Sequence, residues 1–221
     1  MSAIIETPIL EPKEIVKENH IVLPNISWST YESLLNDLAD TTAARLTYNQ
    51  GKLEIMAPLP EHERINRIVA LIVEVVAEEL NIDIEAFGST TFKHKDFVQG
   101  FEPDSCFYIQ HEAIAKGKTK FDLKVDPPPD LIIEIDITNS SIDKLSIYKQ
   151  LAVPEIWRYD GKKVIIYKLE NNDYQILNNS SSFPLLTSEN INYFITQSKN
   201  LKKTVFLKSL RAFLRDKINA K

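Results

Sequence analysis

Cysteine and glycine are scarce in this chain, which has one cysteine, Cys106, and five glycines in 221 residues. A single cysteine excludes an internal disulfide framework, and no Cys/His cluster is present that could hold a structural zinc ion. The few glycines leave no glycine-rich loop of the kind that binds nucleotide phosphates. No apolar run approaches the roughly 20 residues of a membrane span. We therefore expect a cytoplasmic protein with no membrane partner.

The net charge of −5 at pH 7 argues against a protein that coats nucleic acid indiscriminately, because such binding depends on neutralised phosphates. The charge is unevenly distributed along the chain. Residues 199–221 carry eight Lys or Arg and one Asp, a net charge of +7, so the rest of the chain carries −12. This basic segment is typical of a solvated helix face, and a contact with phosphates is the alternative interpretation.

Hydrophobic periodicity predicts an α/β fold. Apolar residues recur at a spacing of three and four between Ile65 and Leu80, which predicts a helix packed along one side. Two alternating runs around Gly51 predict a β-hairpin, and short apolar runs further along predict six strands with one intervening helix. We expect three regions: an N-terminal arm (1–26), a core domain (27–170) and a C-terminal extension (171–221) with two helical segments.

The segment 130–137, which reads DLIIEIDI, places acidic residues inside an apolar strand. Because side chains alternate along a strand, Glu134 and Asp136 share one face, and the other face is wholly apolar. An uncompensated buried carboxylate costs several kcal/mol, against a domain stability of roughly 5 to 15 kcal/mol. A basic side chain, a shared proton or a divalent cation must therefore neutralise this pair.

A third carboxylate, Asp104, follows Pro103 at the start of another apolar run. If the two strands are neighbours, Asp104, Glu134 and Asp136 converge on one pocket suited to Mg²⁺ or Mn²⁺. Lys144 falls in the first turn of the next predicted helix, within reach of the strand end. Carboxylates, a metal ion and a lysine are suited to phosphodiester hydrolysis. A structural ion-pair network is the alternative reading of Glu134, Asp136 and Lys144.

Four motifs in this order resemble the Uma-two family, a bacterial family of endonucleases within the PD-(D/E)XK restriction-endonuclease-like superfamily. The motifs are EPD at 102–104, PPPDLIIEIDIT at 127–138, DKLSIY at 143–148 and VPEIWRYDG at 153–161, and the similarity runs from Ser27 to Leu169. The resemblance implies a mixed β-sheet flanked by helices, with an N-terminal helix and hairpin and a C-terminal helical extension. It also implies metal-dependent nuclease chemistry.

The resemblance assigns roles to individual residues. Asp104 corresponds to the first metal-binding aspartate and Glu134 to the second acidic ligand. The superfamily lysine would fall at position 136, where this chain has Asp136. Asp136 is therefore expected to join the metal ligands, and Lys144 to supply the positive charge. These four residues are the predicted catalytic set, with Mg²⁺ or Mn²⁺ as cofactor.

DNA is the expected substrate, and a homodimer is one expectation, because restriction-like enzymes that cut both strands commonly pair. An alternative is a catalytically inactive nuclease fold that serves as a nucleic-acid-binding or protein-interaction module. The overall acidity and the aspartate at position 136 favour this alternative. A metal-dependent hydrolase of a smaller phosphoester is the third candidate.

Overall fold

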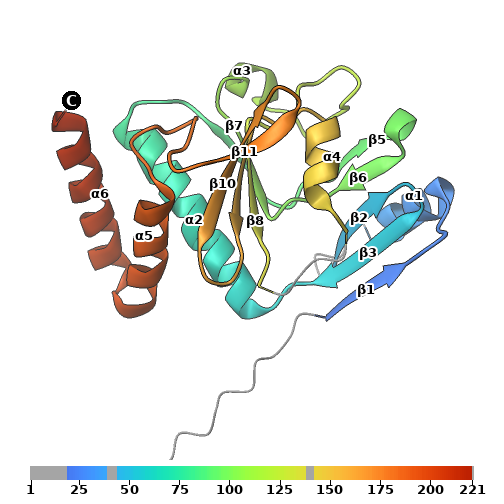
Figure 1. Cartoon of the computed structure of the whole chain (residues 1–221), viewed down its shortest axis with the longest axis horizontal. Coiled ribbons are helices and arrows are strands. Elements are labelled where there is room, and N and C mark those ends of the chain that lie inside the picture. The colour runs from blue at the N-terminus through green and yellow to red at the C-terminus, as the bar shows by residue number, and fades with distance from the viewer. Residues whose placement is uncertain (1–18, 39–43, 138–141, 221) are drawn as a thin grey trace, which may run out of the picture.

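The computed structural model describes residues 19–38, 44–137 and 142–220, which form two β-sheets with flanking helices (Figure 1). The strands are β1 (Asn19–Leu23), β2 (Arg45–Asn49), β3 (Lys52–Ala57), β4 (Glu85–Phe87), β5 (Phe92–His94), β6 (Gln99–Phe101), β7 (Ser105–Tyr108), β8 (Leu131–Ile135), β9 (Glu155–Tyr159), β10 (Val164–Glu170) and β11 (Asp173–Leu177). The α-helices are α1 (Trp28–Asp37), α2 (Pro60–Glu79), α3 (Glu112–Ala115), α4 (Lys144–Gln150), α5 (Ser188–Asn200) and α6 (Lys203–Asn219). A 3₁₀ turn spans Lys95–Phe97.

The larger sheet has six strands in the order β11-β10-β9-β8-β7-β4. Strands β8 and β9 are parallel, and the other neighbouring pairs are antiparallel. A parallel pair needs a long crossover connection, and the segment that contains α4 supplies it. The smaller sheet is antiparallel, with five strands in the order β1-β3-β2-β6-β5. The mixed sheet with flanking helices confirms the predicted fold class.

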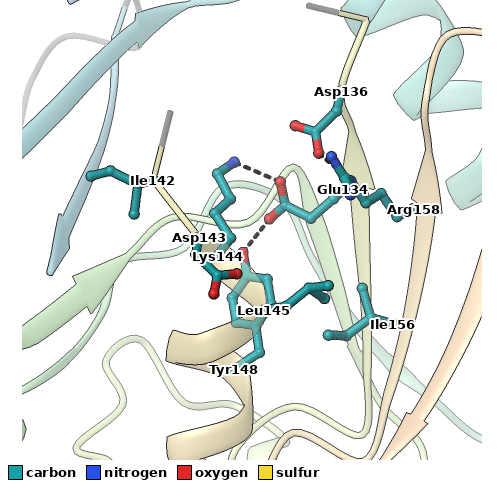
Figure 2. Close-up of a pocket in the computed structure, with 9 residues that line it drawn as sticks. All are labelled: Glu134, Asp136, Ile142, Asp143, Lys144, Leu145, Tyr148, Ile156 and Arg158. Carbon is teal, nitrogen blue, oxygen red and sulfur yellow. Dashed lines mark hydrogen bonds and ion pairs between the residues drawn. The ribbon is translucent and has the colours of Figure 1, made fainter. Parts of the chain in front are cut away.

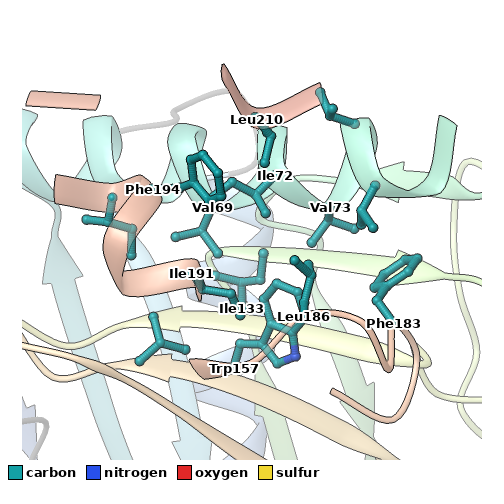
Figure 3. Close-up of a cluster of buried hydrophobic side chains, with 14 of the residues drawn as sticks. Val69, Ile72, Val73, Ile133, Trp157, Phe183, Leu186, Ile191, Phe194 and Leu210 are labelled. Carbon is teal, nitrogen blue, oxygen red and sulfur yellow. The ribbon is translucent and has the colours of Figure 1, made fainter. Parts of the chain in front are cut away.

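Helices α2 and α5 cover one face of the larger sheet, and α6 packs on these two helices (Figure 1). Figure 3 shows Val69 and Ile72 of α2 above Ile133 of β8 and Trp157 of β9. Many residues of α2 are β-branched, which lowers helix propensity, so burial of this apolar stripe holds the helix in place. Pro60 occupies the first turn, where no backbone N–H is needed for an intrahelical bond.

Helix α4 packs on the opposite face of the larger sheet and lies between the two sheets (Figure 1). Ile147 and Tyr148 of α4 are buried against Ile132 of β8. Phe92 and Phe101 of the smaller sheet belong to the same apolar cluster. The strand end that carries Glu134 is therefore enclosed between a helix and a second sheet.

Strand β1 lies inside the region that the sequence suggests is an extended arm. It pairs antiparallel with β3, with Ile21 opposite Ile55. The sequence signal of this strand is weak, because its apolar residues Ile21, Val22 and Leu23 are consecutive and show no alternation. The rest of the expected arm, residues 1–18, lies outside the described residues.

The basic C-terminal segment forms α6, which packs on α2. Phe206, Leu210 and Leu214 are buried, while Arg211 and Arg215 bind acidic residues at the end of α2. Hydrogen bonds from both arginines lower the pKa of Glu79 to about 2. Part of the positive charge of this segment therefore attaches α6 to α2, while other basic residues such as Lys208 are exposed. Among the described residues, no helix is both long enough and apolar enough to cross a membrane.

Replacing Leu210 with alanine tests whether α6 is part of the core. Leu210 is fully buried in the cluster that α6 shares with α2, so the truncation is expected to lower the free energy of unfolding by about 2 to 5 kcal/mol. Lys208→Ala, at an exposed position of the same helix, is the matched control and should stay within about 0.5 kcal/mol of the wild type. Urea unfolding measures both, and equal stability of the two variants would contradict this packing.

Candidate active site at the end of strand β8

Strand β8 places Glu134 in a buried position next to α4. Leu131, Ile133 and Ile135 face the core beneath α2, whereas Ile132 faces α4. Alternation puts Glu134 on the face of Ile132, and its side chain is only 2% exposed. The strand is built from isoleucine and leucine, and a carboxylate at its end therefore needs partners from outside the strand.

Two residues of α4 neutralise and hydrogen-bond Glu134 (Figure 2). The Lys144 ammonium donates to Oε2 of Glu134 at 2.7 Å, and the Tyr148 hydroxyl donates to Oε1. Lys144 is the first residue of α4, within the first helical turn where the sequence predicts it, and Tyr148 lies one turn further along the same face. Asp143 caps the helix by accepting from the backbone N–H of Ser146 at 3.3 Å.

The electrostatics of the pair keep Lys144 charged. Burial by itself lowers the pKa of the Lys144 ammonium, but Glu134, Asp136 and Glu54 outweigh it and raise the pKa above the usual 10.5. Burial and the nearby Glu134 raise the pKa of Tyr148 well above its usual value. At neutral pH Lys144 is therefore an ammonium and Tyr148 a neutral hydroxyl, so neither can accept a proton from water.

Asp136 lies just beyond the end of β8 and binds Arg158 of β9. The Arg158 Nε donates to Asp136 Oδ2 at 2.5 Å, and the parallel register places Arg158 beside Glu134. Glu134, Asp136, Lys144 and Arg158 line one pocket of about 320 Å³ (Figure 2). The sequence analysis did not single out Arg158. A charged residue inside the apolar strand of residues 155–159 is the signal that could have identified it.

Asp104 lies at the start of β7 and belongs to a different pocket. Its Oδ2 accepts from the backbone N–H of Ile135 at 2.6 Å, which ties it to the end of β8. Its Oδ1 forms an ion pair with Arg45 and lies 2.9 Å from the Nε2 of His62. Asp104 and Arg45 line a pocket of about 290 Å³ to which Glu134, Asp136 and Lys144 do not contribute.

The predicted residues are thus only partly brought together. Glu134, Asp136 and Lys144 share one pocket, but Asp104 lines another. The part of the chain that the structure describes contains no group of three or more His, Cys, Asp or Glu side chains arranged to hold a metal ion. Sequence reasoning also missed Arg45 and His62, whose contacts with Asp104 join segments about 40 to 60 residues apart.

The acids of the Glu134 pocket fit a hard divalent cation in their chemistry. Mg²⁺ is commonly bound through one or two carboxylates and keeps several waters. Glu134 and Asp136 supply two such groups on one face. Both oxygens of Glu134 are hydrogen-bonded, whereas the described residues bind only the Oδ2 of Asp136. Of the Glu134 and Asp136 carboxylate oxygens, Asp136 Oδ1 is therefore the one that can accept a ligand without breaking a bond to a described residue.

Comparison with solved structures shows the class of fold. A crystal structure from Anabaena variabilis, titled as a "putative nuclease belonging to DUF820", superposes with a TM-score of 0.53. The sequence identity is 17%, and the match covers 77% of this chain and 99% of that chain. The fold is therefore that of a protein described as a nuclease.

The family follows from a sequence model. The Uma2 model, described as "Putative restriction endonuclease", matches residues 28–192, and the chain belongs to this family. This confirms the resemblance seen in the four sequence motifs. Family and fold together indicate a nuclease. A search of curated proteins found no match.

Removing the Tyr148 hydroxyl tests its role in holding Glu134. In Tyr148→Phe the Glu134 Oε1 loses its hydrogen bond in a buried position, so the free energy of unfolding should fall by about 1 to 3 kcal/mol. Tyr193→Phe, at a half-exposed position of α5, is the control and should be neutral within about 0.5 kcal/mol. Thermal unfolding of both variants measures these changes in stability. An unchanged melting temperature for Tyr148→Phe would show that burial of Glu134 does not depend on this hydrogen bond.

Proposed function

We propose that this chain is a Mg²⁺- or Mn²⁺-dependent endonuclease that hydrolyses DNA phosphodiester bonds, with Asp104, Glu134 and Asp136 as metal ligands and Lys144 as the catalytic cation. The observation that carries the proposal is the buried Glu134–Lys144 pair, which lies beside Asp136 on an accessible pocket. Membership of a family described as restriction endonucleases supports the same reaction class.

Lys144 acts as a positive charge and not as a base. Its raised pKa keeps the ammonium protonated, so it cannot take the proton of the attacking water. Negative charge grows on the phosphoryl oxygens as water attacks and the P–O bond breaks, and a fixed ammonium stabilises that charge. Glu134 and the first turn of α4 hold the ammonium at the pocket, which reduces the reorganisation needed during the reaction.

In this proposal the three carboxylates bind the metal ion together. When bound, the metal ion would polarise a phosphoryl oxygen and lower the pKa of a water molecule. Glu134 and Asp136 already lie on one pocket, and Asp104 is held at the same strand end through the N–H of Ile135. To join the other two, Asp104 must open its ion pair with Arg45 or share its carboxylate between Arg45 and the ion.

A second candidate function is a nuclease-fold module that binds nucleic acid or protein without cleavage. One observation favours it: every predicted acidic ligand is already paired with a protein cation. Asp104 is paired with Arg45, Glu134 with Lys144, and Asp136 with Arg158. A network of this kind neutralises the acids without a metal ion.

A nicking assay on supercoiled plasmid in Mg²⁺ and in Mn²⁺ tests the proposal. Glu134→Gln removes a ligand charge at nearly constant volume, and Lys144→Met removes the catalytic charge. Each is expected to lower the nicking rate by roughly 10²- to 10³-fold, the effect typical of losing one stabilising group. Lys149→Met, at an exposed position of the same helix, is the matched control and should cut at close to the wild-type rate.

Melting temperatures and DNA affinity complete this experiment. Melting temperatures show whether each variant is folded, because Lys144→Met leaves Glu134 buried without its cation. Nicking by folded Glu134→Gln at the wild-type rate would contradict the assignment. Absence of nicking by the wild type, together with DNA affinity that does not depend on divalent cations, would favour the non-catalytic module instead.

A further inference from the structure

We propose that Arg158 binds a phosphate of the DNA strand in the Glu134 pocket and that Asp136 holds its guanidinium in place for this contact. The inference rests on the proposed function, because it names the group that recognises the substrate at the same site. Nothing in the four sequence motifs or in the predicted catalytic set gives Arg158 a role.

The position of Arg158 is fixed by the fold. Strands β8 and β9 are parallel and in register, with Arg158 directly beside Glu134. Neighbouring residues in such a pair point to the same face, so Arg158 emerges on the side of α4 and not into the core beneath α2. Its Nε is bound to Asp136 Oδ2 at 2.5 Å, which orients the plane of the guanidinium.

The Arg158 guanidinium has further N–H donors that can bind an anion. A guanidinium carries five N–H groups, and Asp136 engages the one on Nε. Tyr167 of β10 lies close to the same group. The Arg158 side chain is 30% exposed, compared with 10% for Lys144, so Arg158 is the more accessible of the two cations in the pocket. Its planar fork matches two oxygens of a phosphate, whereas an ammonium acts as a point charge.

The net charge of the pocket determines when a DNA phosphate can bind there. Five charged side chains line it: Glu134, Asp136, Asp143, Lys144 and Arg158. Their sum is −1, and Glu54 near Lys144 adds further negative charge, so the pocket repels a phosphate until a bound divalent cation supplies two positive charges. Arg158 should therefore contribute to DNA binding in the presence of a divalent cation and contribute little in EDTA.

The salt dependence of DNA affinity separates this role from a structural ion pair. Each phosphate contact adds roughly 0.7 to 0.9 to the slope of log affinity against log salt concentration. Binding of a fluorescent duplex is measured in Ca²⁺ and in EDTA over a range of salt concentrations. In Ca²⁺, Arg158→Ala should reduce the slope by about 0.7 to 0.9 and lower the affinity about tenfold or more.

Two further variants exclude an indirect effect of lost stability. Arg158→Gln can still donate to Asp136 but carries no charge, and it should show the same reduction in slope. Arg158→Lys keeps the charge and should restore the slope. Arg215→Ala is the matched control, because Arg215 also binds a glutamate but lies on α6, which packs on α2 and α5, away from the Glu134 pocket.

The outcomes are distinct from those of the nicking assay, because binding is measured without cleavage. Wild-type slopes for folded Arg158→Ala and Arg158→Gln overturn the proposal, and so does a failure of the wild type to bind DNA in Ca²⁺. An equal reduction in slope for Arg215→Ala also overturns it, because the effect would then not be specific to the pocket. A reduced slope specific to Arg158, combined with nicking that does not require Glu134, retains the phosphate contact and rejects the proposed catalysis.

Discussion

The structure of the site depends on the need to neutralise Glu134, a carboxylate enclosed between the larger sheet, α4 and the smaller sheet. Burial of such a group without a partner costs several kcal/mol, a substantial part of the stability of a domain. The chain meets this need with the first residue of α4, Lys144, and with Tyr148 one turn later. The parallel pairing of β8 and β9 requires the crossover that contains α4, and this connection places the helix over the strand end.

The same constraint explains how the acids are distributed between two pockets. Each of the three predicted ligands is paired with a cation from a different element: Arg45 from β2, Lys144 from α4 and Arg158 from β9. These pairings neutralise the acids, and under the proposed function Lys144 and Arg158 also supply positive charge for a phosphate in the Glu134 pocket. A set of cations that neutralises buried acids can therefore resemble a set that catalyses hydrolysis. The proposed function differs from the non-catalytic alternative in whether the acids release their protein partners to bind a metal ion.

Local pattern predicted the α/β class and part of the site, while the mixed sheet flanked by helices was predicted from the family resemblance. Strand alternation placed Glu134 and Asp136 on one face, and the spacing to the next helix placed Lys144 in its first turn. Arg158 could not be predicted to meet Asp136, because their contact requires the parallel register of β8 and β9, which is a property of the whole sheet. The separation of Asp104 from the other acids was also hidden, because it arises from Arg45 and His62, which reach Asp104 only in the folded chain.

The most direct test of this account is a crystal structure of the protein with Mn²⁺, with data collected for anomalous scattering. The account predicts an anomalous peak within bonding distance of Glu134 and Asp136, with the Lys144 ammonium displaced from its direct bond to Glu134 or sharing that carboxylate with the ion. Crystals that diffract well at saturating Mn²⁺, show no peak in this pocket and retain all three ion pairs would contradict it, and would identify the buried acids as a structural network.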